Sequence, residues 1–422
     1  MKASWKKNVI LFITGQSVSL FGSALVQYAI TWYITLSTKS GTMMMISIIC
    51  GFLPTLLVSP FAGVWADRFN RKRMIIAADS MIALSTLAVA VVFSAGSDHL
   101  WPLYVVSAIR ALGQGIQSPA VMAVIPQLVP EDKLTRVNGI NQSIQSLLQI
   151  FAPILSAVLL SISTIRTIFF IDVFTAALAV GIMLLFIQIP DHKNMETGQK
   201  IAYFKDLKEG IHYIRNHIFV SRLMKMLTYY YILITPVAFL SPLQVAISFG
   251  DQVWRQSAIE ITFSAGMIIG GLVIASWGGF KNRAYTIALA GAWIGVGTLA
   301  LGLIPVFWIY LAVMILIGAG IPFWNTPTIV MLQEKVDKEY MGRVFSIISM
   351  IQSVMMPLGM TIFGPMADVI KLEWILAATG ILIILPSFYI INSKVILEAG
   401  KQKAKEEAET GSEEQTKDNL SE

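Results

Sequence analysis

The sequence predicts an all-α membrane protein in which 12 transmembrane helices form two six-helix lobes, with both termini cytoplasmic. Three observations lead to this prediction. Of the 422 residues, 55% are hydrophobic and 13% are charged, and the mean hydropathy is +0.69, whereas soluble domains carry about 25% charged residues. The basic residues are concentrated in every second connection between apolar segments, and parts of the second half of the chain repeat the first half.

The apolar segments are long enough to cross a bilayer. A transmembrane helix needs about 20 mostly apolar residues, and helices are favoured because backbone polar groups in lipid must be hydrogen-bonded within the segment. The first segment is interpreted as an uncleaved span, because it is too long for a signal peptide and lacks a small-residue cleavage site. The twelve segments lie at about 9–36, 43–66, 74–95, 100–125, 138–162, 165–187, 223–247, 257–277, 284–303, 306–330, 343–367 and 373–392.

The distribution of Lys and Arg predicts the orientation. Cytoplasmic loops of membrane proteins are enriched in these residues, and one set of connections, together with both termini, holds all but five of the 31 bases. The connections of the opposite set carry only Lys39, Arg166, Arg255 and Lys371. We therefore expect a multi-pass protein of the cell (plasma) membrane. The net charge of +6 fits loops that lie against anionic lipid, so no nucleic-acid partner is implied.

The longest connection divides the spans into six and six. We expect an N-terminal lobe at 1–187, a cytoplasmic linker at 188–222 and a C-terminal lobe at 223–392. Apolar residues recur at helical spacing between 204 and 214, with charged residues among them, which predicts a short amphipathic helix on the membrane surface. The tail at 393–422 is rich in Glu, Lys and Ser, a composition that predicts a disordered cytoplasmic segment.

An internal repeat relates the two lobes. Residues 134–150 match 341–357 at six of 17 positions, and residues 70–71 reappear as residues 282–283 after the eighth span. Both matches fall between equivalent spans of the two halves. Six-span repeats in parallel orientation are typical of two-lobed secondary transporters, whose substrate site lies between the lobes near the midplane.

A charged run at 63–73, between the second and third spans, resembles a family motif. Its residues Gly63, Asp67, Arg68, Arg71 and Lys72 resemble the loop motif G-x-x-x-D-R-x-G-R-R/K of the major facilitator superfamily. Asn70 replaces the usual glycine, and we expect the turn to survive because Asn tolerates left-handed backbone angles better than most residues.

Other positions extend the resemblance. Arg110, followed by small residues in the fourth span, is a second family mark, whereas Ala152 stands before Pro153 where the antiporter motif of the fifth span has glycine. Stretches similar to the macrolide-efflux branch of Gram-positive drug exporters lie at 125–131, 142–146, 259–267, 333–335 and 342–346.

The resemblance implies a secondary active transporter that works by alternating access. It would export bulky amphipathic drugs, such as macrolide-type antibiotics, by proton antiport and as a monomer. Two alternatives stay open. The same fold could export an endogenous solute such as a siderophore or a lipid, and a membrane sensor or assembly subunit without transport is a more remote possibility.

Four ionisable residues fall inside predicted spans: Asp79, Arg110, Asp172 and Glu260. Each costs about 2.5–3.5 kcal/mol at mid-bilayer on insertion scales, so all four are candidates for proton coupling. The first span contains no acid, which leaves Arg110 without an obvious local partner. Asp79 could alternatively pair with a base of the 67–73 loop, and Glu260 could be an interfacial or helix-start charge.

Polar side chains at helical spacing predict a substrate cavity. They form stripes on the first, fourth and fifth spans, whereas the C-terminal lobe offers few polar residues. A cavity with one polar and one apolar wall suits a bulky amphipathic solute. The alternative is hydrogen bonding that only holds helices together. The candidates are Gln16, Gln27, Arg110, Gln114, Gln117, Gln142, Gln145, Gln149 and Asn325.

The charged run also predicts a gate. As the resemblance implies, the second and eleventh spans meet on the cytoplasmic side, where Asp67 could face the positive N-terminus of the eleventh span. Arg68, Arg71 and Arg343 would add charge partners, and Gly63 belongs to the same motif. This contact would exist only when the cytoplasmic side is closed. Alternatively, the bases of the run serve only as topological anchors.

Several kinds of chemistry are not expected. The sequence has no Walker loop, so ATP would not drive the protein directly. Four histidines and one cysteine offer no metal cluster, and no cofactor or enzymatic activity is predicted. The expected partners are a small amphipathic molecule, protons and the lipid bilayer.

Overall fold

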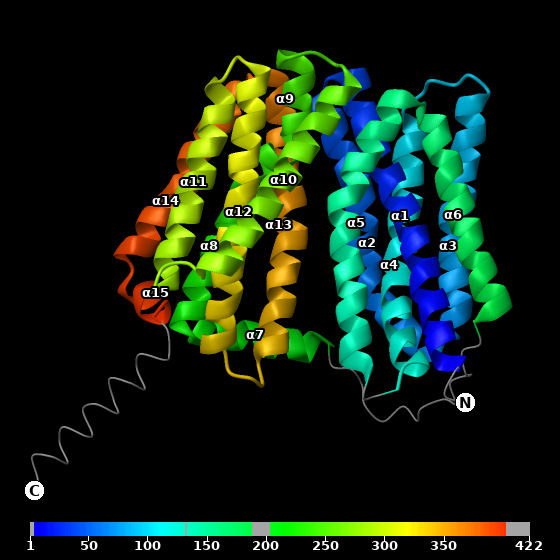
Figure 1. The fold of residues 1–422 in the computed structure, drawn as a ribbon, viewed down its shortest axis with the longest axis horizontal. Helices are drawn as coiled ribbons and strands as arrows, with labels where there is room; N and C mark the ends of the chain where they lie inside the picture. Colours follow the sequence, from blue (N-terminus) through cyan, green and yellow to red (C-terminus); the bar gives the residue numbers. More distant parts are fainter. Residues whose placement is uncertain (1–3, 131–132, 188–202, 402–422) are drawn as a thin grey trace, which may run out of the picture. The chain divides into compact units, whose positions relative to one another are not determined.

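The computed structural model describes residues 4–130, 133–187 and 203–401, and every named element in these ranges is a helix (Figure 1). The chain divides into two compact units. The first contains residues 1–200, 242–260 and 364–369, and the second contains 201–241, 261–363 and 370–422. The last turn of one long helix, α13, therefore belongs to the first unit, although most of that helix belongs to the second.

Six long helices make up most of the first unit. They are α1 (Ser4–Thr38), α2 (Gly41–Arg68), α3 (Arg71–Ser94), α4 (Trp101–Leu128), α5 (Leu134–Ile162) and α6 (Ile165–Phe186). Helix α1 packs against α5 and α6, α2 packs against α4, and α3 packs against α4 and α6.

The remaining helices follow the connection at 188–202, which lies outside the described residues. They are α7 (Tyr203–Asn216), α8 (Ile218–Leu233), the π-helical turn η2 (Pro236–Leu240), α9 (Ser241–Ser248), α10 (Val253–Trp277), α11 (Arg283–Leu303), α12 (Phe307–Lys335), α13 (Met341–Val369), α14 (Leu372–Asn392) and α15 (Lys394–Ala399). Helix α11 packs on α12 and α14. Proline lacks an amide donor and distorts helices, and Pro236 opens the π-helical turn that joins α8 to α9.

Eleven segments of the described chain are long and apolar enough to cross a membrane. They correspond to eleven of the twelve predicted spans, and the remaining long helix is α4. This helix has 28 residues, but Arg110, Gln114, Gln117 and Gln127 lower its hydropathy. The structure thus establishes a multi-pass helical membrane protein.

Asparagine caps start two equivalent helices. Asn70 precedes α3 with φ −64° and ψ 110°, and its side chain accepts a hydrogen bond from the Arg73 amide. Asn282 precedes α11 and accepts one from the Ala284 amide. Asn70 does not use the left-handed backbone angles from which we argued that the turn would survive. Asn is among the preferred N-cap residues because its side-chain oxygen satisfies an otherwise free helix amide, which explains the repeat of Asn-Arg at these positions.

The chain after α14 is helical at first. The predicted disordered tail begins at 393, but α15 covers Lys394–Ala399 and packs on α8, α11 and α14. The Asn282 side chain donates to the Leu397 carbonyl (2.9 Å), and the Arg283 amide donates to the Gly400 carbonyl (3.0 Å). These contacts order the chain through Lys401, and residues 402–422 lie outside the described part.

Two apolar clusters form much of the core of the first six helices. One contains Phe12, Ile75 and Val124, near the N-terminus of α1. The other contains Ile30, Phe93 and Phe169, near the C-terminus of α1. Along α1, α3, α4 and α6, the residues between these clusters include nearly all the buried charged side chains of the unit. Apolar packing therefore shields a polar layer on both sides.

Candidate functional site

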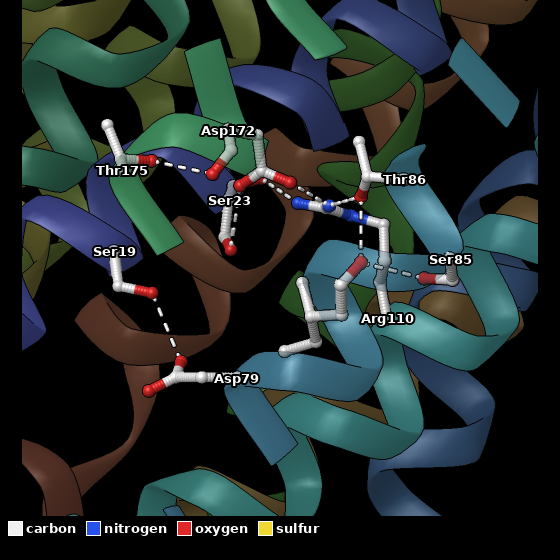
Figure 2. Close-up of polar contacts among 9 residues, drawn as sticks. Ser19, Ser23, Asp79, Ser85, Thr86, Arg110, Asp172 and Thr175 are labelled. Carbon is white, nitrogen blue, oxygen red and sulfur yellow. Dashed lines mark hydrogen bonds and ion pairs between the residues drawn. The ribbon is translucent and has the colours of Figure 1, made fainter. Parts of the chain in front are cut away.

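The polar layer contains a buried ion pair between α4 and α6 (Figure 2). Arg110 is 1% exposed and Asp172 is fully buried, and Nη1 of Arg110 lies 2.5 Å from Oδ2 of Asp172. Sequence reasoning left Arg110 without an obvious partner, and the structure supplies one from the sixth helix. Breaking such a pair by removing one partner costs about 3–5 kcal/mol, so we expect the pair to be maintained.

Neutral groups complete the surroundings of this pair. Nη1 of Arg110 also donates to the Thr86 hydroxyl, and Nη2 donates to the Ser23 carbonyl (2.8 Å). The Ser23 hydroxyl donates to Oδ1 of Asp172 (3.3 Å). The cluster joins α1, α3, α4 and α6 into one charge-neutral network.

A second buried carboxylate, Asp79 of α3, has different neighbours. It is 2% exposed and accepts hydrogen bonds from Gln117 Nε2 (2.6 Å), Ser19 Oγ (3.1 Å) and Gln16 Nε2 (3.4 Å). Figure 2 shows Asp79 and Ser19 apart from the Arg110 cluster. Within the described residues, no cation forms an ion pair with Asp79.

Two bases of the 67–73 loop, Arg71 and Lys72, bind backbone carbonyls. The Lys72 ammonium donates to the carbonyls of Ile187 (2.7 Å) and Leu184 (3.4 Å). Arg71 donates to the carbonyls of Ala66 and Ala123, both at 2.8 Å. These side chains tie the start of α3 to the C-terminal ends of α2, α4 and α6. The alternative in which Asp79 pairs with a loop base therefore finds no support from Arg71, Lys72 or Arg73, and the Arg68 side chain lies outside the described part of the structure.

Glu260 is separated from both clusters. It lies on α10 and is half-buried. Among the described residues, no hydrogen bond or ion pair joins its carboxylate to another side chain. The helix does not begin at Glu260, because α10 starts at Val253, which argues against a helix-start charge.

The structure describes only some of the predicted gate residues of α2. Gly63 is half-buried, and a Cβ atom there would meet nothing within 4 Å. Asp67 and Arg68 occupy the last turn of α2, but their side chains lie outside the described part of the structure. Whether Asp67 reaches α13 therefore stays a prediction.

Arg343, the predicted partner from α13, contacts the linker helix α7. Its guanidinium lies 3.1 Å from a Glu209 carboxylate oxygen and 5.3 Å from the centroid of the Tyr340 ring. The Tyr213 ring stacks on Tyr340 with centroids 4.4 Å apart, and its hydroxyl accepts a hydrogen bond from the Asp337 amide (3.1 Å). Helix α7 is therefore attached to the connection between α12 and α13 and to the first turn of α13.

The candidate cavity residues divide into two groups. Gln16 and Gln117 belong to the Asp79 network, with a hydrogen bond of 3.1 Å from Gln117 Nε2 to Gln16 Oε1. The others do not share one cluster. Gln27, Gln114 and Gln145 are half-buried, whereas Gln142, Gln149 and Asn325 are exposed. Gln27 packs next to Gly51 of α2. Sequence reasoning thus found residues of both kinds without distinguishing them.

Some residues of the polar layer were missed. Thr86 lies seven residues after Asp79 on α3, a spacing that places both on one helix face, so it could have been found. Asp368 was also missed, although it ends a Gly-x-x-Ala-Asp sequence that resembles Gly63–Asp67. No group of three or more His, Cys, Asp or Glu side chains in the described residues could hold a metal ion.

Comparisons with known proteins agree with the fold. The family model for the Major Facilitator Superfamily matches residues 12–360. The chain is 32% identical to Macrolide efflux protein A of Streptococcus pyogenes over 383 residues, which cover 90% of this chain and 94% of that protein. It is 24% identical to the Staphyloferrin A transporter of Staphylococcus aureus over 92% of this chain and 96% of that protein.

A solved structure shows the same fold at lower identity. The crystal structure of a bacterial homologue of the human lysosomal transporter Spinster, in an inward-facing and unoccupied conformation, superposes with a TM-score of 0.66 at 14% identity. The match covers 95% of this chain and 99% of that one. Because the family match extends over most of the sequence and the helices follow the same fold, the chain belongs to the Major Facilitator Superfamily and is a membrane transporter, not an enzyme.

Proposed function

We propose that this transporter exports bulky amphipathic drugs of the macrolide class in exchange for protons. The observation that carries the coupling mode is the buried layer of α1, α3, α4 and α6, where two carboxylates and one guanidinium are enclosed by apolar clusters. Intramembrane ionisable groups are costly and mark ion or proton pathways. The drug class rests on the 32% identity to Macrolide efflux protein A.

The proposed topology has twelve spans, with α4 as the span that carries the buried arginine. The concentration of Lys and Arg at the termini and in alternate connections supports cytoplasmic termini and a plasma-membrane location. The transport unit is proposed to be the single chain. Cysteine placed in the tail would be labelled from outside intact cells if this orientation were inverted.

For substrate binding we propose the exposed amides among the predicted cavity residues. Gln142 and Gln149 are exposed on α5, and Asn325 is exposed on α12. Exposed amides on otherwise apolar helices can bind the hydroxyl and carbonyl groups of an amphipathic drug, while the apolar surroundings bind its hydrophobic part.

For the cytoplasmic gate we propose a contact from Asp67 to the N-terminus of α13. A carboxylate at a helix N-terminus gains about 0.3–2 kcal/mol, which can bias a two-state equilibrium. Arg68, Arg71 and Arg343 would supply further charge contacts at this side. Since Arg343 pairs with Glu209 in the structure, we expect α7 to influence the same gate.

A second candidate function is export of a siderophore or another endogenous solute. The similarity to the Staphyloferrin A transporter favours it as the alternative.

Drug susceptibility tests both candidates. The chain should be expressed in a host without its own efflux pumps and challenged with macrolides, tetracyclines and fluoroquinolones, with and without an uncoupler. We expect raised resistance to macrolides that disappears with the uncoupler. Unchanged susceptibility to every drug would contradict drug export, and resistance that survives the uncoupler would contradict proton antiport. The Asp67→Asn variant should lose transport if the gate is correct.

A further inference from the structure

We propose that Asp79 is the carboxyl group that binds and releases the coupling proton, while Asp172 remains permanently paired with Arg110. This inference rests on the proposed proton-coupled export and identifies its proton-binding site. The two carboxylates lie in the same buried layer, and both are nearly inaccessible. Their partners differ in charge, and that difference assigns the roles.

Asp172 already has a cation as its partner. Its charge is balanced by a guanidinium 2.5 Å away, and arginine stays protonated in proteins and has no acceptor atom. Protonation of Asp172 would leave the buried Arg110 charge uncompensated, at a cost of about 3–5 kcal/mol. The pair is therefore suited to hold four helices together and not to exchange protons.

Asp79 is surrounded by neutral donors. Gln117, Ser19 and Gln16 bind its oxygens, and a buried charge without a counterion is strongly disfavoured. The same partners also suit a protonated carboxyl. A hydroxyl such as that of Ser19 can donate or accept, and an amide such as that of Gln16 offers an oxygen that accepts. The pocket can therefore hold both protonation states without leaving a buried atom unpaired.

The charged groups around Asp79 are few. Helix α4 contributes Arg110, which is engaged with Asp172 of α6. Helix α1 contributes only the neutral Gln16 and Ser19, and the buried part of α2 contributes no charged side chain. On α3 itself, Arg71 and Lys72 bind backbone carbonyls at the helix start. The Asp172 carboxylate acts on Asp79 as a like charge. Among the described residues, Asp79 therefore has only neutral hydrogen-bond partners.

The test uses purified protein in liposomes and compares three variants. Drug uptake driven by a pH gradient measures coupling, and exchange of labelled for unlabelled drug at equal pH measures substrate movement alone. For Asp79→Asn we expect gradient-driven uptake to fall at least tenfold while exchange stays within twofold of wild type. Ser19→Ala is the matched control, because it removes a neighbour of Asp79 but no carboxyl, and it should retain coupling.

The result separates this inference from the proposed function. If the wild type itself shows drug exchange but no response to the pH gradient, proton antiport is wrong. If the wild type is coupled and Asp79→Asn remains equally coupled, antiport stands and the assignment to Asp79 is wrong. Asp172→Asn should lose both exchange and thermal stability, because it leaves Arg110 unpaired. An Asp172→Asn variant that lost only coupling would also overturn the assignment.

A separate observation concerns the ends of α2 and α13. The Asp368 carboxylate, in the last turn of α13, accepts hydrogen bonds from the amides of Gly41 (2.6 Å) and Thr42 (3.1 Å) and from the Ser40 hydroxyl (3.0 Å). These groups form the N-terminus of α2, where an acidic group is favoured. A Cβ atom on Gly41 would collide with the Gly364 carbonyl, so the two helices touch through their backbones.

The sequence of this contact repeats that of the predicted cytoplasmic gate. Gly364, Ala367 and Asp368 have the same spacing as Gly63, Ala66 and Asp67, and each aspartate is the penultimate residue of its helix. We infer that Asp368 is a latch between the predicted extracellular ends of α2 and α13, and that it opens once in every transport cycle. Asp67 and Asp368 would then act in alternation.

Cysteine cross-linking tests the latch. Cys50 is the single native cysteine, so a Cys50→Ser background carries introduced pairs without interference. In Ser40→Cys with Asp368→Cys, transport by the oxidised disulfide should be at least tenfold lower than transport by the same variant after reduction, because the disulfide prevents the two helix ends from separating. A control pair replaces Arg283 and Glu334, which contact each other within the second unit, and its disulfide should leave transport unchanged. Equal transport by the oxidised and the reduced Ser40–Asp368 pair would overturn the latch.

Discussion

The interiors of the two units contain different kinds of buried polar side chains. In the first, Arg110, Asp172 and Asp79 are buried and bonded across four helices. In the described part of the second unit, the buried side chains classed as polar are all Ser or Thr. Thr298 and Thr328, for example, donate to carbonyls four residues earlier in their own helices.

The difference indicates a division of work between the two units. Hydroxyls bonded within their own helix need no partner from a neighbouring helix, so they tolerate changes in helix position. Charged groups bonded across helices respond to any such change. In its described part, the interior of the second unit contains aromatic packing in place of charged groups. The Tyr230 ring stacks there on Trp324, with ring centroids 4.2 Å apart. Under the proposed proton antiport, we expect the first unit to perform the proton chemistry and the second mainly to supply shape.

The largest expected effect that would test this division comes from Arg110→Ala. It leaves the Asp172 carboxylate buried and unpaired, which costs about 3–5 kcal/mol and should abolish transport. Thermal unfolding in detergent measures the loss. The double variant Arg110→Met with Asp172→Leu should recover most of the stability but no transport, and a single variant as stable as wild type would contradict a buried ion pair.

A smaller effect is expected from Gln117→Ala. The change removes the hydrogen bond of 2.6 Å to Asp79, and hydrogen bonds to charged groups contribute about 1.5–3 kcal/mol. It should also alter the pH dependence of transport, because Asp79 loses its closest donor. Transport assays across a pH series, together with thermal unfolding, check both effects. An unchanged pH profile would count against a role for Gln117 in this site.

In the second unit, Trp324→Phe should lower stability without changing coupling. Aromatic pairs contribute about 0.5–1.5 kcal/mol beyond their buried area, and the smaller ring weakens the stack on Tyr230. We expect the ratio of protons to drug molecules, measured in liposomes, to equal that of wild type. A changed ratio would show that the second unit takes part in proton transfer.

Thr328→Val should have a still smaller effect. The lost hydrogen bond is internal to α12, and the new side chain is similar in size, so we expect a change of about 1 kcal/mol or less in unfolding free energy. Comparison of this variant with Gln117→Ala shows how much a hydrogen bond within one helix and a hydrogen bond between helices each contribute to the free energy of unfolding. Equal losses in the two variants would remove the proposed distinction.

The smallest effect concerns an exposed pair between Lys39 and Asp251, whose charged atoms are 3.0 Å apart. The hydrogen bond and the charge of Lys39 lower the pKa of Asp251 below its ordinary value of 3.8. A lowered pKa in the folded state adds stability above the unfolded pKa, and this stability is lost as pH falls through the folded pKa. Lys39→Ala should raise the pKa of Asp251, as NMR titration would show, while transport at neutral pH stays unchanged.

Sequence reasoning found the members of the buried layer but not their pairing. Asp79, Arg110 and Asp172 stand out because a charge inside an apolar segment is costly wherever its partner lies. The partner of Arg110 is 62 residues away on α6, and nothing in the local pattern of α4 indicates it. Likewise, the capping role of Asn70 could have been predicted from residue preference alone, whereas the contact of Asp368 with Gly41 required the packing of α2 on α13.

The sequence by itself determined the positions of the apolar segments and the identity of the ionisable residues within them. Each segment partitions into a membrane according to its own composition, so no knowledge of its neighbours is needed. Only the tertiary structure decided which side chains meet, because that depends on the rotation and close approach of neighbouring helices. Gly22 illustrates this: a Cβ atom there would collide with Thr175 and crowd Asp172. Because Gly22 has no Cβ atom, α1 can approach α6 closely enough for Ser23 to reach the Arg110–Asp172 pair.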